Sequence, residues 1–283
     1  MTSELTAPVA NVNDAATGAV GISDMTPTAG IALHAVPGVI ADRDGMANAV
    51  LSYQWQQLVG GGWVDIAGAT GASHTPTANQ ALRVAVSFTD DRGGVETLFS
   101  LPTGRAGQNV AGTPGADNRV LTALDDRMAA GEGADIVAGG HGFDSLFGEG
   151  GNDRLAGDFG HDLLDGGLGD DTLLGGLGND SMFGGDGADD LNGGTEDDTL
   201  IGGEGGDLLI GGEGDDRMEG GAGDDVLRGG AGADLMFGGE GADNLSGNGD
   251  DDRIDGGGGN DQIAGGEGSD VLRGGLGADI LNG

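Results

Sequence analysis

The apolar positions in the C-terminal half of the chain recur every nine residues without an insertion. From Ala130 the chain divides into seventeen nonapeptides that run to Asn282, and the eighth residue of each is apolar, from Val137 to Leu281. The first, second and fourth residues are mostly Gly, as in GGEGDDRME at 211–219. Gly-rich turns of this kind alternate with short strands whose middle side chain faces inward. The pattern therefore predicts a flattened coil of two parallel sheets, in which each residue lies above the one eighteen positions later.

A different pattern, of period two, marks the N-terminal part of the chain. Every second residue is large and apolar in LRVAVSF at 82–88, and YQWQ at 53–56 alternates in the same way. Further strand candidates lie at 31–36, 63–66 and 95–101. Because such short strands are separated by Gly-rich turns and no helical period appears, this part is predicted to be a β-sandwich with Trp55 in its core.

The sixth residue of every nonapeptide is Asp. Stacked coils place these carboxylates in two columns, one on each edge, where they repel one another. A divalent cation between successive turns would remove this repulsion, and Gly-rich turns would add backbone carbonyl oxygens. An oxygen-only site of this kind suits Ca²⁺ better than Mg²⁺, and zinc would require His or Cys. The predicted metal ligands are Asp135, Asp144, Asp153, Asp162, Asp171, Asp180, Asp189, Asp198, Asp207, Asp216, Asp225, Asp234, Asp243, Asp252, Asp261, Asp270 and Asp279.

Composition and charge narrow the classes of function. The chain has 283 residues, of which 48 are acidic against 11 Lys and Arg, and its formal net charge is −37. A nucleic-acid partner is excluded, because this field would repel the phosphate backbone. No apolar run is long enough for a transmembrane helix, and there is no Cys for a disulfide. With 66 Gly and this self-repulsion, the metal-free repeats are expected to be disordered.

Residues 130–283 resemble the RTX, or hemolysin-type, calcium-binding repeats of bacterial secreted proteins, whose pattern is G-G-x-G-x-D-x-U-x. The resemblance implies a parallel β-roll that holds several Ca²⁺ ions between its turns. It also implies an extracellular protein, exported by the type I secretion machinery without a cleaved N-terminal signal. In that family the chain stays unfolded in the low-calcium cytosol and folds outside the cell.

The N-terminal part resembles the immunoglobulin-like or cadherin-like modules of bacterial surface proteins, in SYQWQQ at 52–57 and LRVAVSFTDDRGGVET at 82–97. This resemblance implies a cell-surface or matrix partner for the module. The predicted organisation is a linker at 1–18, an immunoglobulin-like sandwich at 19–104, a linker with degraded repeats at 105–129 and the β-roll at 130–283.

Five residues depart from Gly at turn positions of the repeat. Glu149, Asp158 and Asn248 occupy the second position, and Glu196 and Asp250 occupy the fourth. These positions need positive φ, which Asp and Asn tolerate better than Glu. Weaker or distorted turns are therefore expected near 148–162 and 193–198.

Other polar residues of the repeats are interpreted as having no role in a site. Acidic residues outside the sixth position are interpreted as solvated surface charge. They include Asp170, Asp215, Asp224, Asp251 and Glu204. His141 and His161 occupy variable positions and are interpreted as exposed neutral side chains.

No catalytic motif is found in the sequence. There is no H-E-x-x-H zinc site, no Ser with Gly two residues before and after it, and no complete dinucleotide fingerprint. The chain is therefore interpreted as non-enzymatic: a secreted calcium-binding protein with a structural or adhesive role. The alternative is the C-terminal part of an RTX exoenzyme or toxin, such as a peroxidase, protease or lipase, without its catalytic domain.

Overall fold

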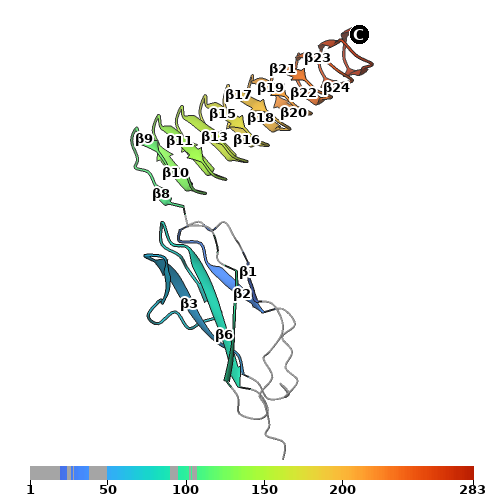
Figure 1. The fold of residues 1–283 in the computed structure, drawn as a ribbon. Coiled ribbons are helices and arrows are strands. Elements are labelled where there is room, and N and C mark those ends of the chain that lie inside the picture. The colour runs from blue at the N-terminus through green and yellow to red at the C-terminus, as the bar shows by residue number, and fades with distance from the viewer. Residues whose placement is uncertain are drawn as a thin grey trace, which may run out of the picture. The chain divides into compact units, whose positions relative to one another are not determined.

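The computed structural model describes residues 20–23, 27, 29–37, 50–89, 95–101, 103 and 107–283. The chain divides into two units, Met1–Arg105 and Ala106–Gly283 (Figure 1). Every regular element of the described residues is a β-strand, which confirms the predicted all-β class. The described part of the chain contains no helix that is long and apolar enough to cross a membrane. The predicted linker at 1–18 lies outside the described residues.

The described residues of the first unit form two antiparallel sheets. Its strands are β1 (Val20–Ile22), β2 (Leu33–Pro37), β3 (Ser52–Val59), β4 (Gly62–Asp65), β5 (Ser73–His74), β6 (Leu82–Thr89) and β7 (Val95–Phe99). One sheet has the order β1-β2-β5 and the other the order β4-β3-β6-β7. Strands form in all five ranges where the alternating pattern predicts them.

One buried cluster joins the two sheets of the first unit. Trp55 of β3 is fully buried, as predicted, and packs in the same cluster as Leu33 of β2 and Val84 of β6. The Trp55 indole N–H donates a hydrogen bond to the Gly71 carbonyl oxygen at 3.0 Å, so this buried polar group is satisfied. Two sheets with a common core agree with a β-sandwich, and the immunoglobulin-like topology stays a prediction.

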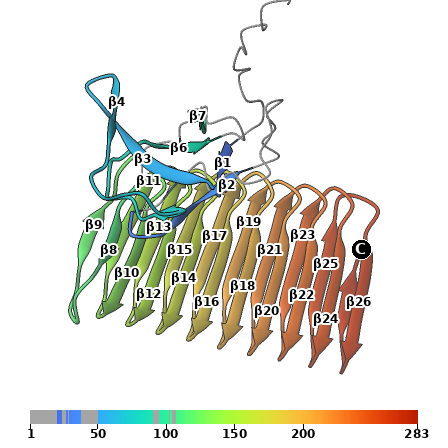
Figure 2. The same cartoon turned by 90° about the horizontal axis from the view of Figure 1, so that it is seen from below.

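The second unit is a parallel β-solenoid of two ten-stranded sheets (Figure 2). One sheet is formed by β8 (Asn109–Ala111), β10 (Arg127–Glu132), β12 (Ser145–Gly150), β14 (Leu163–Leu168), β16 (Ser181–Asp186), β18 (Thr199–Glu204), β20 (Arg217–Ala222), β22 (Leu235–Glu240), β24 (Arg253–Gly258) and β26 (Val271–Leu276). The other sheet is formed by β9 (Asn118–Val120), β11 (Ile136–His141), β13 (Arg154–Phe159), β15 (Thr172–Leu177), β17 (Asp190–Thr195), β19 (Leu208–Glu213), β21 (Val226–Ala231), β23 (Asn244–Gly249), β25 (Gln262–Gly266) and β27 (Ile280–Asn282). Each strand pairs with the strand eighteen residues later, so that Leu200 lies opposite Met218.

The core of the solenoid consists of the eighth residue of each repeat. In β18, Leu200 is fully buried, whereas its neighbours Thr199 and Ile201 are only half-buried because they point outward. The buried core residues of this unit are Met128, Ala130, Val137, Leu146, Leu155, Leu164, Leu173, Met182, Leu191, Leu200, Leu209, Met218, Leu227, Met236, Leu245, Ile254 and Ile263. All of them except Ala130, the first residue of its repeat, occupy the eighth position, and the predicted inward position is thereby confirmed for them.

The solenoid begins before the first regular repeat. Strands β8 and β9 pair in parallel with β10 and β11, so the solenoid starts at Asn109 rather than at Ala130. Val110 and Leu121 of the degraded repeats still pack against the core, which keeps their register. Asp135 therefore has a coil on each side, and its Oδ1 accepts a hydrogen bond from the Asp117 backbone N–H at 2.6 Å.

All five departures from Gly at the turns adopt positive φ. The angles are 72° at Glu149, 74° at Asp158, 74° at Glu196, 79° at Asn248 and 69° at Asp250. The turns persist, because Asp158 still lies opposite Gly140 and Gly176 in the sheet. The distortion is therefore limited to φ, which is smaller at Asp158 than at the opposite Gly140 and Gly176, and the strand pairing is kept.

Replacing Glu196 with Gly is expected to stabilise the calcium-loaded solenoid. A Glu side chain in the left-handed region costs about 1 kcal/mol, which Gly avoids because it has no Cβ. The free energy of unfolding from urea titration at saturating Ca²⁺ should therefore rise by about 1 kcal/mol in Glu196→Gly. Asn248→Gly is the matched control, with a smaller gain because Asn tolerates this region. A Glu196→Gly variant no more stable than the parent would contradict the assignment of strain.

Candidate metal centres

The predicted ligands line both edges of the solenoid and are almost completely removed from solvent. The residues from Asp135 to Asp261 in the two columns are 1–3 % exposed. Asp270 and Asp279, in the last coils, are half-buried. A fully buried carboxylate is costly unless hydrogen bonds or a cation compensate its charge. The partners of each oxygen atom therefore determine what these columns do.

One carboxylate oxygen of each column Asp is bound to the backbone of the preceding coil. The Asp216 backbone N–H donates to Asp234 Oδ1 at 2.9 Å, and the Asp162 N–H donates to Asp180 Oδ1 at 2.7 Å. The donor always lies eighteen residues before the acceptor, which confirms the predicted stacking of the columns. These hydrogen bonds fix each carboxylate in place and leave its second oxygen pointing into the turn.

The second oxygen, Oδ2, is buried and has no hydrogen-bond partner. This holds for Asp135, Asp144, Asp153, Asp162, Asp171, Asp180, Asp189, Asp198, Asp207, Asp216, Asp225, Asp234, Asp243, Asp252 and Asp261. Native proteins rarely leave buried polar atoms unpaired, and a bound ion is one of the few explanations for such an atom. The repetition of the same orphaned atom at fifteen positions points to a common ligand.

The first position of the repeat, which is Gly in all repeats after Ala130, keeps space around Oδ2. A Cβ atom on Gly175 would collide with Asp180 Oδ2 and would lie 2.6 Å from the Gly193 carbonyl oxygen of the next coil. A carboxylate oxygen and a carbonyl oxygen therefore face the same small space, which any larger side chain would fill. Carboxylate and carbonyl oxygen atoms are the donor set of a hard cation such as Ca²⁺.

Burial raises the pKa of the column carboxyl groups from Asp144 to Asp252 above the usual value for Asp. Desolvation, with a smaller contribution from neighbouring Asp residues, raises the pKa of Asp198 and Asp234 to about 7. Desolvation likewise raises the pKa of Asp180 and Asp216 to about 6. The backbone hydrogen bond to Oδ1 opposes the shift at each of these residues. A cation that binds here therefore competes with protons near neutral pH.

Two Asp residues of the degraded repeats occupy the same columns but have protein partners on Oδ2. Asp126 Oδ2 accepts hydrogen bonds from the Thr122 backbone N–H at 2.6 Å and from the Thr122 hydroxyl at 2.7 Å. Asp117 Oδ2 accepts the same pair of bonds from Thr113, which lowers the pKa of Asp117. The Oδ2 atoms of these two turns have hydrogen-bond donors within the protein, so the first coil of the solenoid needs no cation at these positions. Their signal in the sequence is Thr at the second position, where the regular repeats have Gly.

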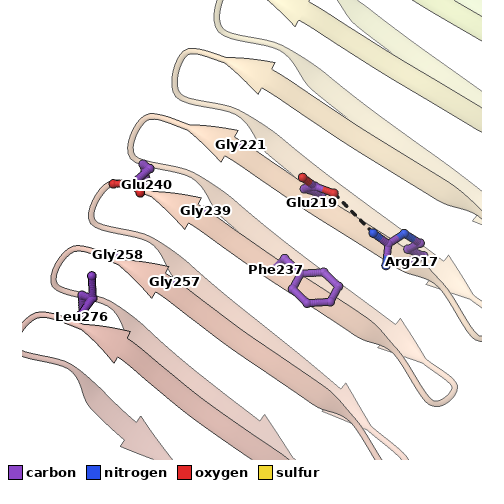
Figure 3. A pocket seen from close by; sticks show the side chains of 9 residues that line it. All are labelled: Arg217, Glu219, Gly221, Phe237, Gly239, Glu240, Gly257, Gly258 and Leu276. Carbon is purple, nitrogen blue, oxygen red and sulfur yellow. Dashed lines mark hydrogen bonds and ion pairs between the residues drawn. The ribbon is translucent and has the colours of Figure 1, made fainter.

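A shallow groove of about 440 Å³ lies on the outer face of the sheet that runs from β8 to β26 (Figure 3). Gly221, Gly239 and Gly257 are among the residues that line it. The Arg217 guanidinium forms an ion pair with Glu219 at 3.4 Å and lies 5.1 Å from the centre of the Phe237 ring. The groove contains no column Asp, and the charge of Arg217 has a partner within it. It is therefore separate from the candidate metal sites.

In the part of the chain that the structure describes, no three His, Cys, Asp or Glu side chains converge on one point as a metal cluster. A cation between two coils would thus be held by column carboxylates together with backbone carbonyl groups. This donor set excludes a typical zinc site and agrees with Ca²⁺.

Comparison with known protein families finds the RTX calcium-binding nonapeptide repeat, described as four copies per match. The matches cover residues 129–164, 165–200, 192–227, 201–236, 210–245, 228–263 and 255–283. The comparison with curated proteins finds no match. The matched region spans 129–283, which is more than half of the chain and includes all seventeen predicted ligands. The chain therefore belongs to the RTX calcium-binding nonapeptide repeat family.

Proposed function

We propose that this chain is an extracellular structural or adhesive protein whose solenoid folds when Ca²⁺ binds between its turns. The observation that carries the proposal is the set of fifteen buried Asp Oδ2 atoms without a partner. We call the space between the turns of two successive coils a gap. A cation in each gap would compensate these charges and join the two coils. Binding and folding would then be the same event, because no such gap exists in the unfolded chain.

Several features support a role outside the cell. Extracellular modules bind Ca²⁺ at roughly 10⁻⁴–10⁻³ M, so such repeats would stay unfolded at cytosolic concentrations. Export as an unfolded chain by a type I secretion system follows from this coupling and from the family's usual route. The first unit, with two sheets and one core, would supply an immunoglobulin-like module for a cell-surface or matrix partner. The proposed role is non-enzymatic, because the sequence contains none of the catalytic motifs sought.

Far-UV circular dichroism during a Ca²⁺ titration tests the proposal. The β-sheet signal should increase cooperatively near millimolar Ca²⁺, at the concentrations typical of extracellular modules. Mg²⁺ is the control and should have little effect, because it prefers a smaller octahedral site with retained waters. An equal response to both cations, or no response to either, would show that the columns are not calcium sites.

A further inference from the structure

A second ladder of hydrogen bonds runs along the turns, at the fifth residue of the repeats. Asp215 Oδ1 accepts a hydrogen bond from the Ala233 backbone N–H at 2.8 Å, and Asp224 Oδ1 accepts one from the Ala242 N–H at 2.8 Å. The acceptor lies eighteen residues before the donor in each case. The same bond to the next coil is made by Asp125, Asn152, His161, Asp170, Asp197, Asp251 and Asn260. Asp170, Asp215, Asp224 and Asp251 are exposed, in agreement with their interpretation as solvated charge, and each in addition accepts a hydrogen bond from the next coil.

The two ladders connect the same pair of coils in opposite directions. In the sixth position, the Asp216 backbone N–H donates forward to the Asp234 side chain. In the fifth position, the Asp215 side chain accepts from the Ala233 backbone N–H of that next coil. In a gap with both bonds, two adjacent residues of one coil are hydrogen-bonded to two adjacent residues of the next. Two hydrogen bonds thus hold the turns on either side of the candidate cation in place.

Only some gaps have a side chain that can make the second bond. Ala188, Gly206, Ala233 and Ala242 occupy the fifth position in other repeats and carry no side-chain acceptor. The gaps that follow these residues depend on the sixth-position bond and on the strand pairing. The gaps of the solenoid are therefore not equivalent, although their column Asp residues are the same.

We propose that the fifth-position acceptors are positioning residues that set the calcium affinity of individual gaps. This inference rests on the proposed function. Where the fifth residue of the first turn is an Asp, Asn or His acceptor, Ca²⁺ binds between that turn and the next at a lower concentration. Where this residue is Ala or Gly, a higher Ca²⁺ concentration is needed. Part of the free energy of cation binding is used to order the turn. A hydrogen bond that already orders the turn reduces this cost, so the cation binds more tightly.

The hydrogen bond, rather than the charge, is the feature shared by these acceptors. Asn152 and Asn260 make the bond through an uncharged amide oxygen, and His161 makes it through Nδ1 at 2.7 Å. Because the residue type varies while the bond to the next coil is kept, an Asn should replace an Asp without loss. Charge alone would instead favour Asp at every one of these positions.

Hydrogen exchange measured by mass spectrometry across a Ca²⁺ series tests the proposal, with the Ala233 backbone amide as the local probe. Asp215→Ala should raise the Ca²⁺ concentration that half-protects this amide by about fivefold, the worth of one net hydrogen bond. Asp215→Asn should stay within about twofold of the parent, because it keeps the acceptor. Glu213→Ala is the matched control, since it removes one charge from the same turn and leaves the ladder intact.

A gain-of-acceptor variant guards against simple misfolding. Ala188→Asn should lower the Ca²⁺ concentration needed to protect the Gly206 amide by a factor of about five. The inference is overturned if Asp215→Asn behaves like Asp215→Ala, if Glu213→Ala produces the same shift, or if Ala188→Asn has no effect. Absence of any calcium-dependent protection in the parent chain would instead refute the proposed function itself.

Discussion

Removal of calcium at neutral pH is expected to unfold the solenoid while Trp55 stays buried. Neighbouring carboxylates in a column are one strand spacing apart, about 4.8 Å. At an effective dielectric constant near 20, each such pair repels by about 3 kcal/mol. Summed over two columns, this repulsion exceeds the 5–15 kcal/mol stability of a typical domain. The metal-free solenoid is therefore not expected to persist at pH 7.5.

Two optical signals separate the units in this experiment. Both Trp residues, Trp55 and Trp63, lie in the first unit, so tryptophan emission reports on that unit alone. Addition of the chelator EGTA should abolish most of the far-UV β-sheet signal and leave the emission maximum unchanged. Readdition of Ca²⁺ is the control and should restore the signal. A persistent β-sheet signal in EGTA, or a shift in Trp emission, would contradict the expectation.

Acid is expected to replace calcium in part, because the column carboxyl groups from Asp144 to Asp252 have raised pKa values. The pKa of Asp144 and Asp225 is raised to about 7, chiefly by desolvation, whereas an unfolded Asp has a pKa near 3.9. The folded, metal-free state therefore binds more protons than the unfolded state. Its stability is greatest below about pH 4, falls as the pH rises and reaches its minimum above about pH 7.

The opposite dependence is expected with calcium present, since the cation binds the ionised carboxylate. The half-saturating Ca²⁺ concentration should therefore increase as the pH falls from 7 towards 5. Circular dichroism of the calcium-free chain between pH 7.5 and 5 measures the first effect, and Ca²⁺ titrations at each pH measure the second. Light scattering is needed as a control, because the sequence pI is about 4.1 and association increases near it.

A neutral variant gives a matched test of this pH dependence. Asp234→Asn keeps the shape of the side chain and imitates the protonated carboxyl group. It should stabilise the metal-free solenoid at pH 7.5 and weaken calcium binding at its own gaps. Loss of stability in both states would show that ionisation of Asp234 does not oppose folding.

The nine-residue period was sufficient to predict the solenoid and its core. A chain that turns at every Gly-rich segment has one inward side chain per strand, so the position of Leu200 and its equivalents follows from the pattern. The same spacing places Asp216 next to Asp234 in one column, and the alternation around Trp55 predicts a buried side chain. These features depend only on periodicity and on the separation of apolar from polar residues.

Other features of the columns required the tertiary structure. Only the folded structure shows that Oδ1 is bound to the previous coil while Oδ2 is left without a partner. The Thr122 donors at Asp126 and the acceptor role of Asp215 were likewise not predicted. Each depends on the direction in which a side chain leaves its turn and on the backbone atom it meets in the neighbouring coil.

The sequence by itself thus determined the fold class of the repeats, the register of their coils and the identity of the candidate ligands. The tertiary structure decided where the solenoid begins, at Asn109, and which turns are satisfied without a cation. It also decided which gaps carry a second hydrogen bond. The physical reason is that a period specifies which residues stack, whereas hydrogen bonds depend on distances and directions of about 3 Å between residues eighteen positions apart.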